Sequence, residues 1–224
     1  MATIPVTRLP NTSIAAMKCP PGTKMHILDL GTLQVDESWI LRGANASALS
    51  NKNPKNKRRD LIDLSALIEY PGVGRTLFET ECAENIDVEL KHACWAVATG
   101  ADLGVHMGHY LLLESLNWNT FNDSHLEIFQ GISLHHLPGH TPELCGMQIN
   151  LQRDGTFIWT TDQFHVGENY ELGHPHGALA RDHNAWYRSL NTVRRLQRIY
   201  NAKLIFGHDK IVAMEYKNAK SFYQ

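Results

Sequence analysis

Three polar residues, each placed just after a short apolar segment, are the residues of this sequence best suited to chemistry. His140 follows a Pro-Gly pair after "ISLHHL", Asp162 ends "TFIWTTD", and His208 follows "KLIFG". Strand ends are rigid and accessible, and the loops that they carry commonly bear functional residues. Imidazole and carboxylate are the zinc ligands used where thiolate is missing. From spacing alone, however, such residues are more often ordinary turn residues than metal ligands.

The elements that must position these three residues are indicated by apolar periodicity. Alternating apolar and polar residues predict strands on both sides of each candidate site. The predicted strands lie in 24–41 (two strands with a bend at Gly31), at the end of 51–70, in 74–80 (a hairpin through Pro71-Gly72), in 125–137 (two strands around Gly131) and in 203–206. We therefore expect a fold rich in short strands.

The segment 145–162 gives the clearest local prediction. Two alternating apolar runs flank Asp154-Gly155, a pair that favours a tight hairpin turn. Two helices are also predicted, one over 88–99, ended by Gly100, and an amphipathic one over 182–202, with Asp182 as N-cap. The apolar stripe of the second helix consists of Trp186, Leu190, Val193, Leu196 and Tyr200. This stripe is expected to pack on the sheet that carries Asp162.

The composition predicts one globular domain spanning residues 1–224. The chain is 43% hydrophobic and 20% charged, with a formal net charge of −2, which gives no electrostatic reason to expect nucleic acid or an anionic membrane as a partner. We see neither an apolar run of about 20 residues, as a membrane span requires, nor a signal peptide at the N-terminus. The four cysteines are scattered, which favours reduced thiols and a cytoplasmic location.

Several segments resemble a known family. The stretches "LPGHTPELCGMQINL", "TTDQFHVGENY", "LARDHNAWYRSL" and "AKLIFGHD" are similar to the C-terminal half of the metallo-β-lactamase superfamily, and in particular to its N-acyl-homoserine-lactone lactonase-like branch. The stretches "LDLGTLQVDESWILRGANAS" and "LIEYPGVGRTLFET" resemble the N-terminal strands of that branch. The resemblance covers most of residues 25–210. It implies an α/β fold, an αββα sandwich with metals at one edge of the sheets.

The resemblance also implies roles for individual residues. His140 would ligate one metal ion, His208 the other, and Asp162 would bridge both, with two zinc ions as the cofactor. Family members often carry a tyrosine three residues after the bridging aspartate, where it hydrogen-bonds to substrate. His165 stands at that position here, so the resemblance makes Asp162 and His165 the candidate catalytic residues.

One part of the family pattern is absent from this chain. The His-x-His-x-Asp-His motif, which supplies most of the metal ligands, does not occur. It is expected between Thr80 and Val88, where "ECAENID" stands instead. The resemblance therefore implies an internal deletion of several dozen residues near 81–88, and a sandwich that is incomplete in its N-terminal half.

Other histidines do not reproduce the missing motif. In "HPHGALARDH", five residues separate His176 from Asp182, where the motif has one. His106 and His109 are compatible with one face of a helix. His135 and His136 are adjacent in a predicted strand, so their side chains point to opposite faces. We interpret all of these histidines as structural or surface residues.

The function implied by the resemblance is that of a zinc-dependent lactone hydrolase. A metal-bound hydroxide would open the ring of an acyl-homoserine-lactone-like substrate, which is quorum-quenching chemistry. We expect this activity to be impaired, since two ligands per metal, one of them shared, fall short of the usual three. The alternative is a non-catalytic remnant that binds metal weakly or acts as an interaction module. The expected partner is a small lactone or ester, and self-association is possible because a deletion would expose apolar surface.

Overall fold

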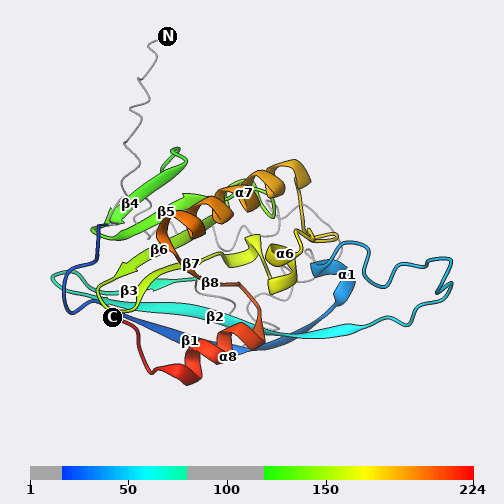
Figure 1. Cartoon of the computed structure of the whole chain (residues 1–224), viewed down its shortest axis with the longest axis horizontal. Coiled ribbons are helices and arrows are strands. Elements are labelled where there is room, and N and C mark those ends of the chain that lie inside the picture. Colours follow the sequence, from blue (N-terminus) through cyan, green and yellow to red (C-terminus); the bar gives the residue numbers. More distant parts are fainter. Residues whose placement is uncertain (1–16, 80–118) are drawn as a thin grey trace, which may run out of the picture. The chain divides into compact units, whose positions relative to one another are not determined.

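A computed structural model describes residues 17–79 and 119–224 (Figure 1). The elements below belong to one compact unit, formed by residues up to Glu79 together with those from Asp123 onward. Its first sheet has three antiparallel strands in the order β1-β2-β3. These strands are β1 (Lys24–Asp36), β2 (Arg58–Tyr70) and β3 (Gly74–Phe78).

The second sheet has five strands in sequential order, β4-β5-β6-β7-β8. They are β4 (His125–Phe129), β5 (Ile132–His136), β6 (Cys145–Leu151), β7 (Gly155–Trp159) and β8 (Lys203–Ile205). The first four are antiparallel, whereas β8 runs parallel to β7. A parallel pair needs a long crossover, and here the crossover contains η2 (Thr161–Gln163), α6 (Gly167–Glu171) and α7 (His183–Tyr200). Asp162 therefore lies near the start of the crossover, and His208 follows β8, the strand to which the crossover returns.

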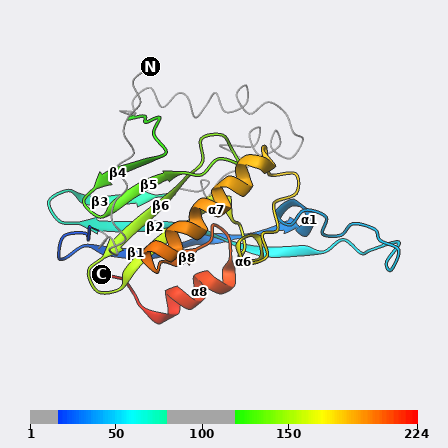
Figure 2. The ribbon, with the colours of Figure 1, turned by 45° about the horizontal axis from the view of Figure 1, so that its top comes forward.

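The alternation of side chains along β7 divides the apolar interior into two layers. Phe157 and Trp159 join a core formed with residues of the three-stranded sheet, such as Leu64 and Ile68. Ile158, on the opposite face, packs with the apolar stripe of α7. Figure 2 shows α7 lying across the five-stranded sheet, as the sequence predicted. The last helix, α8 (Lys210–Ala219), packs against β1 and β2.

Most of the predicted elements in the described residues are confirmed. The hairpin β6–β7 turns at Asp154-Gly155, and the carboxylate of Asp182 caps α7 by accepting a hydrogen bond of 2.9 Å from the amide of Ala185. In α7, Trp186, Leu190, Val193 and Leu196 are buried. The predicted helix over 88–99 and the deletion near 81–88 lie outside the described residues.

The prediction of two strands in 24–41 was wrong at its C-terminal end. β1 continues through an irregularity at Gly31 as far as Asp36, and a short helix, α1 (Glu37–Ile40), replaces the end of the second predicted strand. Asp36 is the reason, because its carboxylate accepts a hydrogen bond of 2.9 Å from the amide of Ser38 and so caps a helical turn.

Within the described residues, no helix combines the length and apolarity needed to cross a membrane.

Candidate metal centre

Asp162 is held at the end of β7 by a strained turn. The preceding residue, Thr161, has φ +49°, a left-handed conformation that β-branched residues rarely adopt. Its hydroxyl donates to the carbonyl of Cys145 at 3.1 Å, and the amide of Thr160 donates to the carbonyl of Ile205 at 2.9 Å. These bonds to β6 and β8 keep the strained residue in place, and they fix the direction in which the Asp162 side chain leaves the sheet.

His208 is placed beside this turn by a glycine. A Cβ added to Gly207 would lie 2.7 Å from the carbonyl oxygen of Thr161, so only glycine permits the close approach of the two segments. The amide of Gly207 donates to the carbonyl of Phe164 at 3.0 Å, and that of His208 donates to the carbonyl of His165 at 2.9 Å. The end of β8 is thus tied by backbone bonds to the segment that follows Asp162.

The turn that carries His140 is packed against the start of α7. Gly139 has φ +150°, and a Cβ on it would lie 2.5 Å from the Cα of Trp186. Its carbonyl accepts a hydrogen bond of 3.0 Å from the amide of Asp182. The "PGH" turn therefore depends on glycine for its close packing, and α7 holds His140 opposite Asp162.

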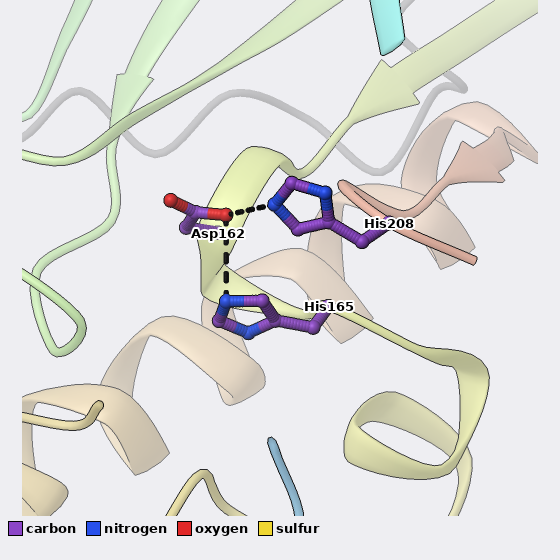
Figure 3. Close-up of side chains that lie close together, drawn as sticks. All are labelled: Asp162, His165 and His208. Atoms are coloured by element: carbon purple, nitrogen blue, oxygen red, sulfur yellow. Dashed lines mark hydrogen bonds and ion pairs between the residues drawn. The ribbon is translucent and has the colours of Figure 1, made fainter. Parts of the chain in front are cut away.

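The three predicted residues converge, and His165 joins them. The Oδ1 atom of Asp162 lies 2.9 Å from Nε2 of His208 and 3.5 Å from Nε2 of His165 (Figure 3). The other oxygen, Oδ2, lies 3.4 Å from Nε2 of His140. In the cluster of Asp162, His165 and His208, the potential ligand atoms all lie within 4.8 Å of one another. The three side chains thus lie together, as a shared metal site requires, whereas the metal-binding role of these residues stays a prediction.

His176, which sequence analysis interpreted as a structural or surface residue, lies beside the site. Its Nε2 lies 2.9 Å from Nδ1 of His165, and its ring, which is fully buried, packs 5.9 Å from that of Trp186 and 5.8 Å from that of His140. It follows α6 in an irregular segment, and its spacing from the other residues matches no motif. No sequence signal placed it beside the site, because only the return of the chain from α6 toward α7 brings it there.

The other histidines are placed largely as the sequence implied. His135 is buried and hydrogen-bonded to Gln148, whereas its neighbour His136 is exposed, so they occupy opposite faces of β5. His174 bonds to the carbonyl of Arg42, away from Asp162. The pair His106 and His109 lies outside the described residues.

The surrounding histidines lower the pKa of Asp162, and burial lowers the pKa of three of the histidine rings. Burial acts to raise the pKa of Asp162, but the nearby rings of His165, His208 and His140 outweigh it and hold that pKa well below its usual value. Burial lowers the pKa of His165 well below its usual value, with His176 adding to the effect, and lowers that of His176 to about 3. Burial also lowers the pKa of His140, against the opposing effect of Asp162. Neutral imidazoles offer the lone pairs that metal ions require.

The hydrogen bonds of His208 fit a cation at this site. Its Nδ1 lies 3.0 Å from the carbonyl oxygen of Ile62, which can only accept, so Nδ1 carries a proton. Its other nitrogen, Nε2, faces Oδ1 of Asp162, a carboxylate oxygen 2.9 Å away. Two lone pairs at this distance repel unless a proton or a metal ion lies between them. With imidazole and carboxylate as donors, the group fits a zinc-like ion.

Comparisons with known proteins agree with this fold. No family model matches the chain. It is 27% identical over 110 residues to an N-acyl homoserine lactonase of Bacillus sp, a match that covers 46% of this chain and only 42% of that relative. The chain therefore spans less than half the length of this curated relative.

Solved structures match over most of the chain. One is an N-acyl homoserine lactone hydrolase with its product N-hexanoyl-L-homoserine bound at the catalytic metal centre, with TM-score 0.64, 16% identity, and coverage of 92% of this chain and 97% of that one. Another is AidC, a dizinc quorum-quenching lactonase, with TM-score 0.59, 10% identity, and coverage of 84% and 88%. Several structural neighbours of this chain are thus N-acyl homoserine lactonases, and the chain has their α/β fold.

Proposed function

We propose that this chain is a metal-dependent hydrolase of the lactonase type, which opens the ring of an N-acyl-homoserine-lactone-like substrate. The observation that carries the proposal is the convergence of His140, Asp162 and His208, from three separate loops, at one edge of the five-stranded sheet. In one solved neighbour of the same fold, the product N-hexanoyl-L-homoserine lies at a catalytic metal centre. Fold and donor set therefore support the same chemistry.

The proposed metal-binding residues are disposed around a single carboxylate. His208 faces one oxygen of Asp162 and His140 faces the other, which is the arrangement expected of a bridging ligand between two positions. Zinc is the proposed ion, because the donors are imidazole and carboxylate and a solved neighbour is a dizinc lactonase. A bound cation of this kind supplies Lewis acidity, which polarises a carbonyl group and activates water.

The protein's own part is to hold charges and orient rings. Asp162 stays ionised at neutral pH and so remains an acceptor on both oxygens. His165 presents only Nε2 toward the site, since its Nδ1 is engaged by His176. In the overall reaction, water adds across the acyl carbon–oxygen bond of the ring. The products are one carboxylate and one hydroxyl in the same molecule, with release of a proton.

We propose that activity is lower than in a relative that carries the His-x-His-x-Asp-His motif, because this sequence lacks it. The same absence favours a second candidate, a non-catalytic remnant of the fold that binds metal weakly or serves as an interaction module. Self-association is part of both proposals.

Cys19 and Cys145 are free thiols in the described part of the chain, which supports a reducing compartment such as the cytoplasm.

The test combines metal analysis with a proton-release assay. Zinc content of the purified chain is measured by mass spectrometry, and hydrolysis of an N-acyl homoserine lactone is followed by the fall in pH. We expect slow hydrolysis that stops on chelation and is lost in Asp162→Asn. The matched control is His125→Gln, a substitution of an exposed histidine on β4, which should behave like the unaltered chain. Zinc binding without hydrolysis would instead support the remnant.

A further inference from the structure

His165 meets the geometric requirements of a third ligand beside Asp162 and His208. The Nε2 atoms of the two histidines approach the same carboxylate oxygen, Oδ1, at 3.5 and 2.9 Å (Figure 3). Together the residues offer two imidazole nitrogens and one carboxylate. Three protein ligands of this kind, with a fourth position left open, are what catalytic zinc sites commonly use.

The surroundings of His165 are poorly suited to a role as a simple hydrogen-bond donor. Its side chain is 5% exposed, and Nδ1 is already engaged by His176. The remaining nitrogen lies 3.5 Å from Oδ1 of Asp162, which is longer than the 2.7–3.2 Å of a good N–H···O bond. The ring is therefore aimed at the carboxylate without forming a strong bond to it, as expected if a cation belongs between them.

His176 completes the arrangement by fixing the orientation of the His165 ring. A histidine that ligates metal almost always donates its other ring N–H to an acceptor, which sets its tautomer. The Nε2 atom of His176 is placed to accept from Nδ1 of His165, as the carbonyl of Ile62 is placed to accept from Nδ1 of His208. In this state the Nδ1–H group of His176, which has no hydrogen-bond partner in the described residues, is left unpaired. Leaving a buried N–H group unpaired destabilises the fold, and binding of a cation at His165 offsets this loss of stability.

We infer that Asp162, His165 and His208 hold a single divalent cation, with His176 as the positioning residue that orients His165. His140 faces the opposite carboxylate oxygen and is not a ligand of this ion. The inference rests on the proposed hydrolase function and deepens it by revising the metal centre: one ion held by three ligands takes the place of the two positions, with His140 at one of them, that were proposed above. A histidine at position 165 supplies one additional ligand, and so compensates in part for the His-x-His-x-Asp-His motif that this sequence lacks.

The first test measures the zinc affinity and stoichiometry of the full chain, by competition with a coloured chelator. The unaltered protein should bind one equivalent. His165→Gln should weaken binding more than His140→Gln does, because only His165 shares Oδ1 of Asp162 with His208. His125→Gln should leave the affinity unchanged. Two equivalents of similar affinity, or a His165→Gln variant that binds as the unaltered chain does, would overturn the inference.

The second test separates positioning from packing at His176. Its replacement by leucine removes the acceptor for Nδ1 of His165, and zinc affinity should fall by about 10- to 100-fold, the usual effect of losing an outer-shell partner. His176→Gln keeps an amide oxygen that can accept the same hydrogen bond, so it should restore much of the affinity. The visible absorption of bound cobalt(II) should change in His176→Leu and recover in His176→Gln. If His176→Leu and His176→Gln lose zinc affinity equally and their cobalt spectra do not change, His176 has no positioning role.

A measurement on the unaltered chain covers the case in which variants fail to fold. Histidine labelled with ¹⁵N reports by NMR which ring nitrogen is protonated and which is bound to zinc. Two histidines, His165 and His208, should change at Nε2 when zinc is added, and Nδ1 should stay protonated in both. Zinc bound through His140 instead of His165 would sink the inference and leave the proposed hydrolase intact. Zinc bound through His165 without lactone hydrolysis would support the three-ligand site and contradict the proposed hydrolase.

Discussion

The ring nitrogen Nδ1 of His165 lies 2.9 Å from Nε2 of His176, eleven residues further along the chain. The two buried rings form one hydrogen-bonded pair, with centroids 4.2 Å apart, and only one of them faces Asp162. The pair therefore behaves as a unit. A change at His176, which has no ion-pair contact with the carboxylate in the described structure, should be felt at Asp162 through the orientation of His165.

The pH dependence of stability should reveal the buried ring of His176. Its pKa is about 3 in the folded chain, against an ordinary value of 6.5. As the pH falls below 6.5, the unfolded chain binds a proton that the folded chain does not, so this residue lowers stability by about 1.4 kcal/mol per pH unit over that window. Chemical unfolding with a chelator present, at pH 7.5 and 5.5, measures the effect.

His176→Leu is the variant that checks this assignment. It removes the titrating group, so its stability should fall less between the two pH values than that of the unaltered chain. An identical fall in both proteins would mean that other residues account for the pH dependence.

Gly207→Ala should disrupt the site through the backbone. The added methyl group would lie 2.7 Å from the carbonyl oxygen of Thr161, in a turn that is already strained, so the segment carrying His208 must move away from Asp162. Overpacking of this kind costs about 1–3 kcal/mol, and zinc affinity should fall as well. Gly167→Ala is the control, since its nearest neighbour lies at 3.4 Å. Thermal unfolding and zinc titration measure stability and zinc affinity in both variants. Equal stability and equal zinc affinity of Gly207→Ala and Gly167→Ala would contradict the role of Gly207.

Leu190→Ala should destabilise the fold by about 2–5 kcal/mol, as a large-to-small change in a buried layer. Leu190 is 3% exposed and belongs to the stripe with which α7 packs on the sheet. Leu172→Ala serves as the matched control because Leu172 is 73% exposed. The free energy of unfolding in denaturant gives the comparison. A loss under about 1 kcal/mol at Leu190 would show that the stripe contributes little to the core.

Removal of the helix cap should weaken the fold at the start of α7, which packs against the turn that carries His140. Asp182 caps α7 with its carboxylate, and its amide donates to the carbonyl of Gly139. Asp182→Ala keeps the amide and loses the cap, which should cost about 0.5–2 kcal/mol. Asn184→Ala, at an exposed position in the same helical turn, is the comparison. Denaturant unfolding that ranks the two variants equally would argue against the cap.

Local periodicity in the sequence was enough to predict many of the elements. The hairpin around Asp154-Gly155, the apolar stripe of α7 and its Asp182 cap follow from alternation, helical spacing and a side chain that bonds its own backbone. These features depend on residues close together in the chain, which is why they are readable from one sequence. Where a local bond competed with a longer pattern, as at Asp36, the prediction failed.

Their positions at the ends of apolar strands identified His140, Asp162 and His208 as candidate residues, and the family resemblance implied a common metal-binding role for them. Only the tertiary structure determined which atoms face one another. The crossover between β7 and β8 brings Asp162 and His208 to a contact of 2.9 Å across 46 residues of sequence, and the return of the chain after α6 buries His176 against His165. Such contacts leave no periodic trace, because they arise from the packing of irregular segments whose positions are set by the sheets and α7 beneath them.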